Sequence, residues 1–170
     1  MNIYTKKGDK GETRVLTGNK LSKSSDLICA LGEIDELNSF LGWASFVCMA
    51  DCYTDGNILN NIKKIQQDLY KMAAELAGSG KVKISDKNVS WLESNINATC
   101  EWKKVHKFTR PGERGELSSR VHICRCVCRR AERAVCKLAE ERGETDGAKL
   151  AVILKYLNRL SDLLFAMSEY

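Results

Sequence analysis

The sequence has one proline and two histidines among its 170 residues. Because proline interrupts helices, its near absence permits long ones. No stretch approaches the roughly 20 uncharged apolar residues of a membrane-spanning helix, and residues 1–7 contain no apolar signal core. With 44% hydrophobic residues, the composition fits one globular domain over residues 1–170, which we expect to be cytoplasmic.

Cysteine pairs and histidine motifs typical of metal sites are also missing. The eight cysteines include no C-x-x-C pair, which argues against a zinc ribbon or a redox motif. Without an export signal, disulfides are not expected. We expect small buried thiols in a helical core, with a metal site as the alternative. Neither histidine follows a glutamate by three residues, so the metal ligands of ferritin-like bundles are absent.

Apolar residues recur at intervals of three and four through most of the chain. Residues 1–25 lack this spacing, so we expect an ordered loop or a flexible tail there. Beyond them the spacing predicts helices. The expected helices cover residues 26–49, 58–76, 86–100, 118–141 and 146–167. The predicted fold class is therefore all-α, a five-helix bundle over residues 26–170 preceded by a non-helical N-terminal segment.

Positive charge is concentrated in one part of the sequence. Residues 103–133 contain ten Lys or Arg and three acidic residues, whereas the whole chain has a net charge of +5. On a helix, Arg125, Arg129, Glu132 and Arg133 share one face. Arginine forks suit phosphate oxygens, which favours an anionic partner. The alternative is a solvated basic face, or arginines that pair with acids on neighbouring helices.

A nucleic-acid-binding bundle is the main rival that this basic window supports. However, neither a helix-turn-helix signature nor interleaved aromatic and basic residues are present. The segment from Tyr4 to Thr13 mixes glycines, hydroxyls and lysines, which suits backbone amides that wrap a phosphate. It is not a Walker A loop, because neither the required spacing nor the strand–helix context is found. We expect neither a nucleic-acid partner nor a membrane.

Three blocks of sequence together resemble the PduO-type ATP:cob(I)alamin adenosyltransferases. The first is Y-T-K-x-G-D-x-G-x-T at residues 4–13, followed by Gly18 and Lys23. The second is A-x-G-x-x-D-E-L-N-S at residues 30–39. The third is R-x-V-C-R-R-A-E-R at residues 125–133, followed by Y-L-N-R-L-S-D at residues 156–162. The blocks occur in the family's order and cover nearly the whole chain.

This resemblance implies a five-helix bundle that forms a homotrimer with active sites between subunits. The implied activity is transfer of the 5′-deoxyadenosyl group of ATP to cob(I)alamin, which gives adenosylcobalamin and triphosphate. Mg²⁺ would accompany ATP, and an external electron donor, a reductase, would supply cobalt as Co(I). Within the family, a bulky apolar side chain below the corrin is thought to displace the lower axial ligand of cobalt.

The resemblance also implies roles for individual residues. The ATP-binding set would be Thr5, Lys6, Gly8, Asp9, Gly11, Thr13, Lys23, Arg129, Glu132 and Asn158. Glu132 is the candidate ligand for Mg²⁺ carried by ATP. Asp35 and Arg125 would form a salt bridge across the subunit boundary, and Phe108 would lie against the lower face of the corrin. The catalytic set is therefore Arg129, Phe108, Asp35 and Arg125.

Overall fold

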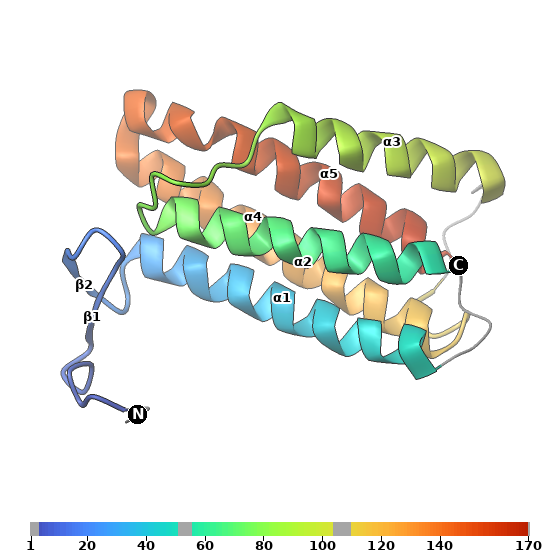
Figure 1. Ribbon diagram of the computed structural model, residues 1–170, viewed down its shortest axis with the longest axis horizontal. Coiled ribbons are helices and arrows are strands. Elements are labelled where there is room, and N and C mark those ends of the chain that lie inside the picture. Colours follow the sequence, from blue (N-terminus) through green and yellow to red (C-terminus); the bar gives the residue numbers. More distant parts are fainter. Residues whose placement is uncertain (1–3, 51–55, 104–109, 170) are drawn as a thin grey trace.

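The computed structural model describes residues 4–50, 56–103 and 110–169. Most of these residues are helical (Figure 1), which confirms the prediction of a mainly helical protein. The elements are β1 (Glu12–Arg14), β2 (Lys20–Ser22), α1 (Asp26–Ala50), α2 (Gly56–Leu76), α3 (Asp86–Lys103), α4 (Glu116–Gly147), the 3₁₀ turn η1 (Ala148–Leu150) and α5 (Ala151–Ser168). Within the described residues, no helix combines the length and the apolar character that crossing a membrane requires.

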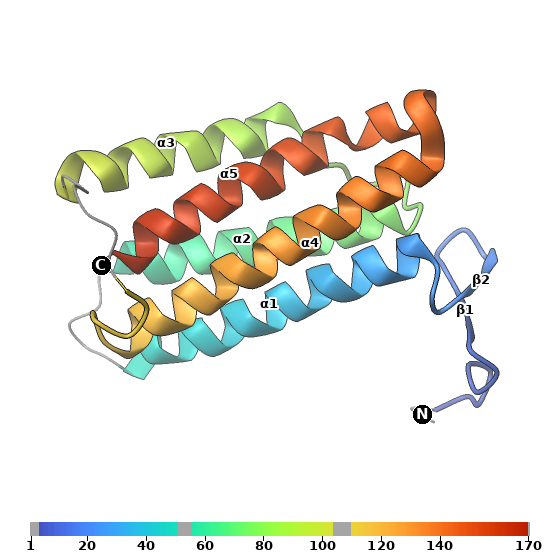
Figure 2. The ribbon, with the colours of Figure 1, turned by 180° about the vertical axis from the view of Figure 1, so that it is seen from behind.

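The long helices pack side by side into a bundle with one shared apolar core. Helix α1 lies along α2 and α4, and α5 lies along α4 and α3 (Figures 1 and 2). The stripes that the sequence predicts face inward: Leu37, Ile65 and Leu160, from three different helices, are fully buried. Burying one such side chain contributes about 1.5–3 kcal/mol. The bundle therefore supplies the rigid frame on which polar side chains are placed.

The N-terminal segment contains a β-hairpin that the sequence did not predict. Strands β1 and β2 pair antiparallel, with Thr13 opposite Leu21. Each strand has only three residues, too few to show the alternation of polar and apolar residues by which strands are recognised. The expected loop or tail is thus in part a hairpin, and it lies beside the first turn of α1 (Figure 2).

Helix α4 is broken close to its predicted end at residue 141. Its range runs to Gly147, but Gly143 has non-helical angles (φ 73°, ψ 178°), so two helical segments meet at a kink there. The glycine expected to stop the helix therefore does interrupt it, and a further helical segment follows it. At its other end, α4 is fastened to the end of α5, because Ser118 Oγ donates to the Ser168 carbonyl (2.6 Å).

The cysteines follow the predicted burial only in part. Cys48, Cys124 and Cys128 are buried, and burial raises the pKa of the Cys124 thiol to about 12. Burial also raises the pKa of Cys128, so the two buried thiols of α4 stay protonated and behave as small apolar groups. The prediction is wrong for Cys29, Cys100, Cys126 and Cys136, which are exposed. No cluster of three metal-binding side chains occurs among the described residues.

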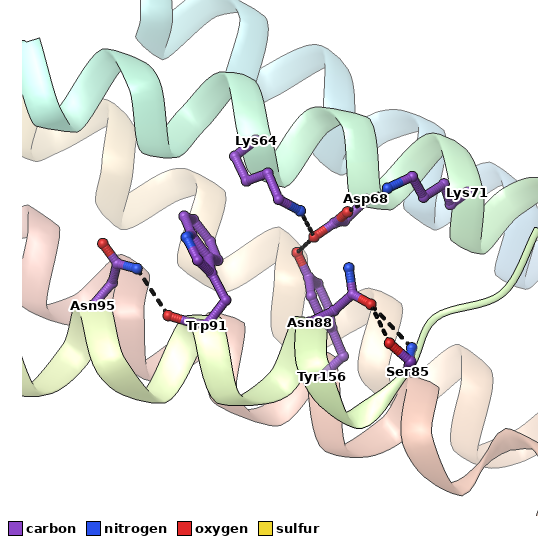
Figure 3. A network of polar contacts seen from close by, with 8 residues as sticks. All are labelled: Lys64, Asp68, Lys71, Ser85, Asn88, Trp91, Asn95 and Tyr156. Atoms are coloured by element: carbon purple, nitrogen blue, oxygen red, sulfur yellow. Dashed lines mark hydrogen bonds and ion pairs between the residues drawn. The ribbon is translucent and has the colours of Figure 1, made fainter.

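A buried carboxylate joins three helices in the interior of the bundle. Asp68 of α2 is fully buried, and it accepts hydrogen bonds from Lys64 (2.5 Å), Lys71 (3.3 Å) and the Tyr156 hydroxyl of α5 (3.4 Å). Figure 3 shows Asn88 of α3 beside the same carboxylate. Burial raises the pKa of Asp68, but its hydrogen bonds to Lys64 and Asn88 outweigh burial and hold that pKa below 3.8.

We expect Asp68→Asn to destabilise the protein by about 2 kcal/mol at pH 7, because the Lys64 and Lys71 charges lose their partner. The partial exposure of both lysines limits the loss. Because the folded-state pKa of Asp68 is lowered, its contribution is present above about pH 4 and declines as the pH falls through that pKa. Urea unfolding of both proteins at pH 7, 5 and 3 measures this, with the exposed Asp146→Asn as control. An equal difference at all three pH values would contradict it.

Candidate active site

A polar hollow of about 420 Å³ lies at the hairpin. Its lining includes Thr5, Gly8 and Thr13 from the predicted ATP-binding set. The cationic residues Lys7, Arg14 and Lys20 line it as well, together with Glu12, which pairs with Lys20. The structure therefore brings together three of the seven predicted N-terminal residues in a place suited to an anion.

The backbone before the hairpin is tightly turned. Lys6 has φ +58°, the only positive φ among the described non-glycine residues. Such strained backbone is characteristic of functional sites. The amides of Asp9 and Gly11 donate to the carbonyls of Lys6 (3.4 Å) and Gly8 (3.2 Å). These turns place the peptide groups of residues 6–11 close together without a helix or strand.

Lys23 lies against the same turns. Its amide donates to the Gly11 carbonyl (2.8 Å), and its ammonium group lies 3.1 Å from the position that a Cβ on Gly8 would occupy. A larger residue at position 8 would therefore crowd this lysine. Hence Gly8, Gly11 and Lys23, which are separated in sequence, form one local group.

A second hollow, of about 430 Å³, lies between the hairpin and α1. Thr13 and Arg14 line both hollows, whereas Gly32 and Asp35 belong to the second alone. The Asp35 side chain is exposed. Among the described residues it makes no ion pair, and Arg125, its expected partner, donates to the Cys126 thiol (3.7 Å). The Asp35–Arg125 salt bridge, which is expected between subunits, is not formed within one chain.

The remaining predicted ATP contacts lie on α4 and α5. Asn158 Nδ2 donates to Glu132 Oε1 (3.2 Å), which joins two predicted site residues across the helices. Arg129 is exposed, and within the described part of the chain its guanidinium forms no ion pair. By contrast, Arg130 pairs with Glu33 and Glu36 of α1. Arg130 thus follows the alternative of pairing with acids of a neighbouring helix, and Arg129 does not.

The segment expected to face the corrin is described only from residue 110 onward, so Phe108 lies outside the described residues. Two charged side chains of this segment have internal partners: Arg110 pairs with Glu113 (2.7 Å) and Arg114 pairs with Glu169 (3.2 Å). Pro111 lines a third hollow, of about 510 Å³, between α1 and α4. The first pair therefore stabilises the segment itself, and the second ties the segment to the end of α5.

Three cations of the first hollow were not predicted as site residues. Lys7, Arg14 and Lys20 fall at positions between the residues of the N-terminal sequence block. Arg14 also donates to the Gly18 carbonyl (2.8 Å), which fastens it to the hairpin turn. The sequence signal was the local excess of lysine and arginine, but only the pairing of β1 with β2 shows that Arg14 and Lys20 lie opposite each other.

Fold and site together define a helical bundle whose N-terminal segment combines cations and strained backbone in a place suited to an anion. The family model described as cobalamin adenosyltransferase matches residues 3–170, so the chain belongs to this family. A corrinoid adenosyltransferase of Bacillus subtilis is 38% identical over 99% of this chain and 86% of its own length. The corrinoid adenosyltransferase PduO of Salmonella typhimurium is 37% identical over 99% of this chain. The chain spans about half the length of that relative (49%).

Solved structures agree with this assignment. A variant of the PduO-type ATP:corrinoid adenosyltransferase from Lactobacillus reuteri, complexed with cobalamin and ATP, is 35% identical with a TM-score of 0.83. The match covers 98% of this chain and 91% of that one. Another variant of this Lactobacillus reuteri enzyme, complexed with ATP, has a TM-score of 0.82 at 34% identity. The same arrangement of helices thus occurs in proteins that carry both ligands.

Proposed function

We propose that this protein transfers the 5′-deoxyadenosyl group of ATP to cob(I)alamin, forming adenosylcobalamin and triphosphate. The observation that carries the proposal is the cationic hollow at the hairpin, built from the sequence block that resembles the family's ATP-binding segment. The family match over residues 3–170 supports it. In this assignment ATP and cob(I)alamin are both substrates, and the N-terminal segment is the ATP-binding element.

The residues suit a reaction that needs positioning and charge stabilisation. The cobalt of cob(I)alamin is itself the nucleophile, and it attacks the ribose C5′ carbon and displaces triphosphate. The leaving triphosphate gains negative charge, which Arg129, Lys6 and Lys23 stabilise. Preorganised donors of this kind act without reorganising during the reaction. An external reductase would supply the electrons that produce Co(I).

Glu132 fits a magnesium ion that arrives with ATP. Its Oε1 accepts from Asn158, and a carboxylate has further lone pairs for a metal or a water. Magnesium bound to nucleotides uses one or two carboxylates and otherwise phosphate oxygens and water. A single glutamate can therefore serve as the protein ligand. When bound, Mg²⁺ would neutralise part of the triphosphate charge.

We infer that the sites form between subunits of a homotrimer. Asp35 and Arg125 support this, because neither has an ionic partner among the described residues, and Arg125 Nε is buried without a hydrogen bond. A buried donor without an acceptor is costly. A neighbouring copy that places its Asp35 carboxylate against Arg125 would remove that cost. The same arrangement would bring the hairpin of one copy toward Arg129 of another.

We expect Asp35→Ala to raise the KM for cob(I)alamin several-fold and to weaken the trimer, because Arg125 is left without its acidic partner. Steady-state kinetics and sedimentation velocity measure the two effects. The charge swap of Asp35→Arg with Arg125→Asp is the matched variant, and it should recover much of the loss. Unchanged kinetics and unchanged size in Asp35→Ala would contradict the intersubunit salt bridge.

The reaction itself is tested by anaerobic incubation of the protein with ATP, Mg²⁺ and chemically reduced cobalamin. We expect the Co(I) absorbance to disappear and a light-sensitive cobalt–carbon product to form. Omission of ATP is the control for reoxidation of cobalt. Steep, salt-dependent binding of RNA or DNA, with neither ATP binding nor product, would favour the rival interpretation of a nucleic-acid-binding bundle.

A further inference from the structure

Helix α2 ends in a C-terminal capping motif in which Gly78 takes the left-handed position. The Ser79 amide donates to the Ala74 carbonyl (2.8 Å), and the Gly78 amide donates to the Glu75 carbonyl (3.0 Å). This pair of bonds is a Schellman motif with Gly78 in the left-handed position, at φ +92°. Any other residue would strain the backbone there. The end of α2 is thus fixed within a residue by local geometry.

The same glycine is also covered by the turn of the hairpin. A Cβ on Gly78 would lie only 2.3 Å from Thr17 Cγ2, far inside contact distance, and 3.7 Å from Thr17 Cβ. The other described glycines with positive φ have no neighbour within 4 Å of such a Cβ. The methyl group of Thr17 therefore occupies space that is open only because residue 78 has no side chain.

Thr17 is rigidly connected to the first hollow. Two hydrogen bonds close the hairpin turn: the Val15 amide donates to the Asn19 carbonyl (3.2 Å), and the Gly18 amide donates to the Val15 carbonyl (2.9 Å). Arg14, which lines the hollow, donates to the Gly18 carbonyl (2.8 Å). A displacement of the turn would therefore move Arg14 with it.

The turn contact joins the hairpin to a second helix of the bundle. In sequence, the hairpin joins α1 through residues 23–25, and Val15 and Leu16 line the second hollow together with Ile28 and Leu31 of α1. The contact of Thr17 with Gly78 adds a point of attachment at the end of α2 and so helps to fix the orientation of the hairpin. Thr13 and Ala77 line the same second hollow, so hairpin and α2 meet beside Asp35.

We propose that Gly78 is a positioning residue for ATP: by leaving room for Thr17, it seats the hairpin so that its cations meet the triphosphate. This inference rests on the proposed function, since it assigns a role to the same ATP-binding segment. Gly78 contacts no substrate and acts through the hairpin. Neither the N-terminal sequence block nor the helical blocks contain it.

The test is Gly78→Ala in the full-length protein. We expect the KM for ATP to rise about tenfold, with kcat within about twofold and the KM for cob(I)alamin unchanged, because only ground-state binding of ATP is weakened. Adding Thr17→Ser removes Cγ2 and leaves the Thr17 Cβ at 3.7 Å, so the double variant should return the KM for ATP to within about twofold of Thr17→Ser alone. The backbone strain caused by alanine at residue 78 would remain in Gly78→Ala and in the double variant, so it cannot explain a recovery.

Gly143→Ala is the matched control, because Gly143 also has positive φ but an added Cβ would meet nothing there. It should lower stability without changing the KM for ATP. If Gly78→Ala does not fold, Thr17→Ala removes the contact by deleting the Thr17 methyl group instead. We then expect an increase of about threefold in the KM for ATP.

An unchanged KM for ATP in Gly78→Ala, or no recovery on adding Thr17→Ser, would contradict the proposed role of Gly78. If Thr17→Ala has to be used instead, an unchanged KM for ATP in that variant would contradict it equally. Lys6→Ala separates this failure from failure of the proposed function. If Lys6→Ala raises the KM for ATP while Gly78→Ala does not, the segment binds ATP but Gly78 does not position it. If neither changes it, the ATP-binding role of the segment is wrong.

Discussion

Arg129→Ala is expected to lower turnover about a hundredfold while leaving the fold intact. A donor aimed at charge that develops in the transition state contributes about 3 kcal/mol, which corresponds to that factor. The side chain is exposed on α4 and makes no ion pair among the described residues. Its removal therefore leaves no buried partner behind, and thermal unfolding should be nearly unchanged.

Two further variants separate the effect of position from that of side-chain geometry. Arg142→Ala removes the same charge from an exposed position farther along α4 and should leave turnover nearly unchanged. Arg129→Lys keeps the charge but loses the two-pronged geometry that suits phosphate, so we expect an intermediate rate. Pre-steady-state measurement of cobalt–carbon bond formation distinguishes chemistry from product release. A near-normal rate in Arg129→Ala would remove this residue from the active site.

The helices were predictable because their signal is long and repeated. Residues such as Leu37 and Leu160 recur at helical spacing over several turns, and each adds to the same pattern. The hairpin was not predictable in this way, since β1 and β2 have three residues each and their pairing depends on the turn between them. The burial of Asp68 could not be predicted either, because its partners, two lysines, Tyr156 and Asn88, come from three helices.

The candidate site was predictable as residue types and not as an arrangement. Sequence spacing places Arg125, Arg129 and Arg133 on one face, but it does not tell which arginines are already neutralised. The fold decides this: Arg130 pairs with Glu33 and Glu36, whereas Arg129 forms no ion pair with an acid of the described chain. Likewise, the contact between Gly78 and Thr17 joins segments about 60 residues apart in sequence, and no local pattern encodes it.

The outer face of α1 offers the most direct test of the proposed trimer. Trp43, Phe46 and Met49 are 45%, 63% and 61% exposed, and at helical spacing they continue the face that carries Asp35. Single exposed apolar residues are ordinary, whereas a cluster of large ones marks an interaction surface. Since Asp35 is assigned to the subunit boundary, we take this cluster to be part of the same interface.

Phe46→Asp should therefore convert the trimer to monomers and lower activity at least tenfold, because a carboxylate would be buried in an apolar contact and the shared sites would be lost. Size-exclusion chromatography with light scattering, followed by activity at the same protein concentration, measures both effects. Tyr70→Asp is the control, since Tyr70 is 67% exposed on α2 and its substitution should leave assembly intact. A Phe46→Asp trimer with full activity would place the interface elsewhere, whereas a fully active monomer would show that each chain carries a complete site.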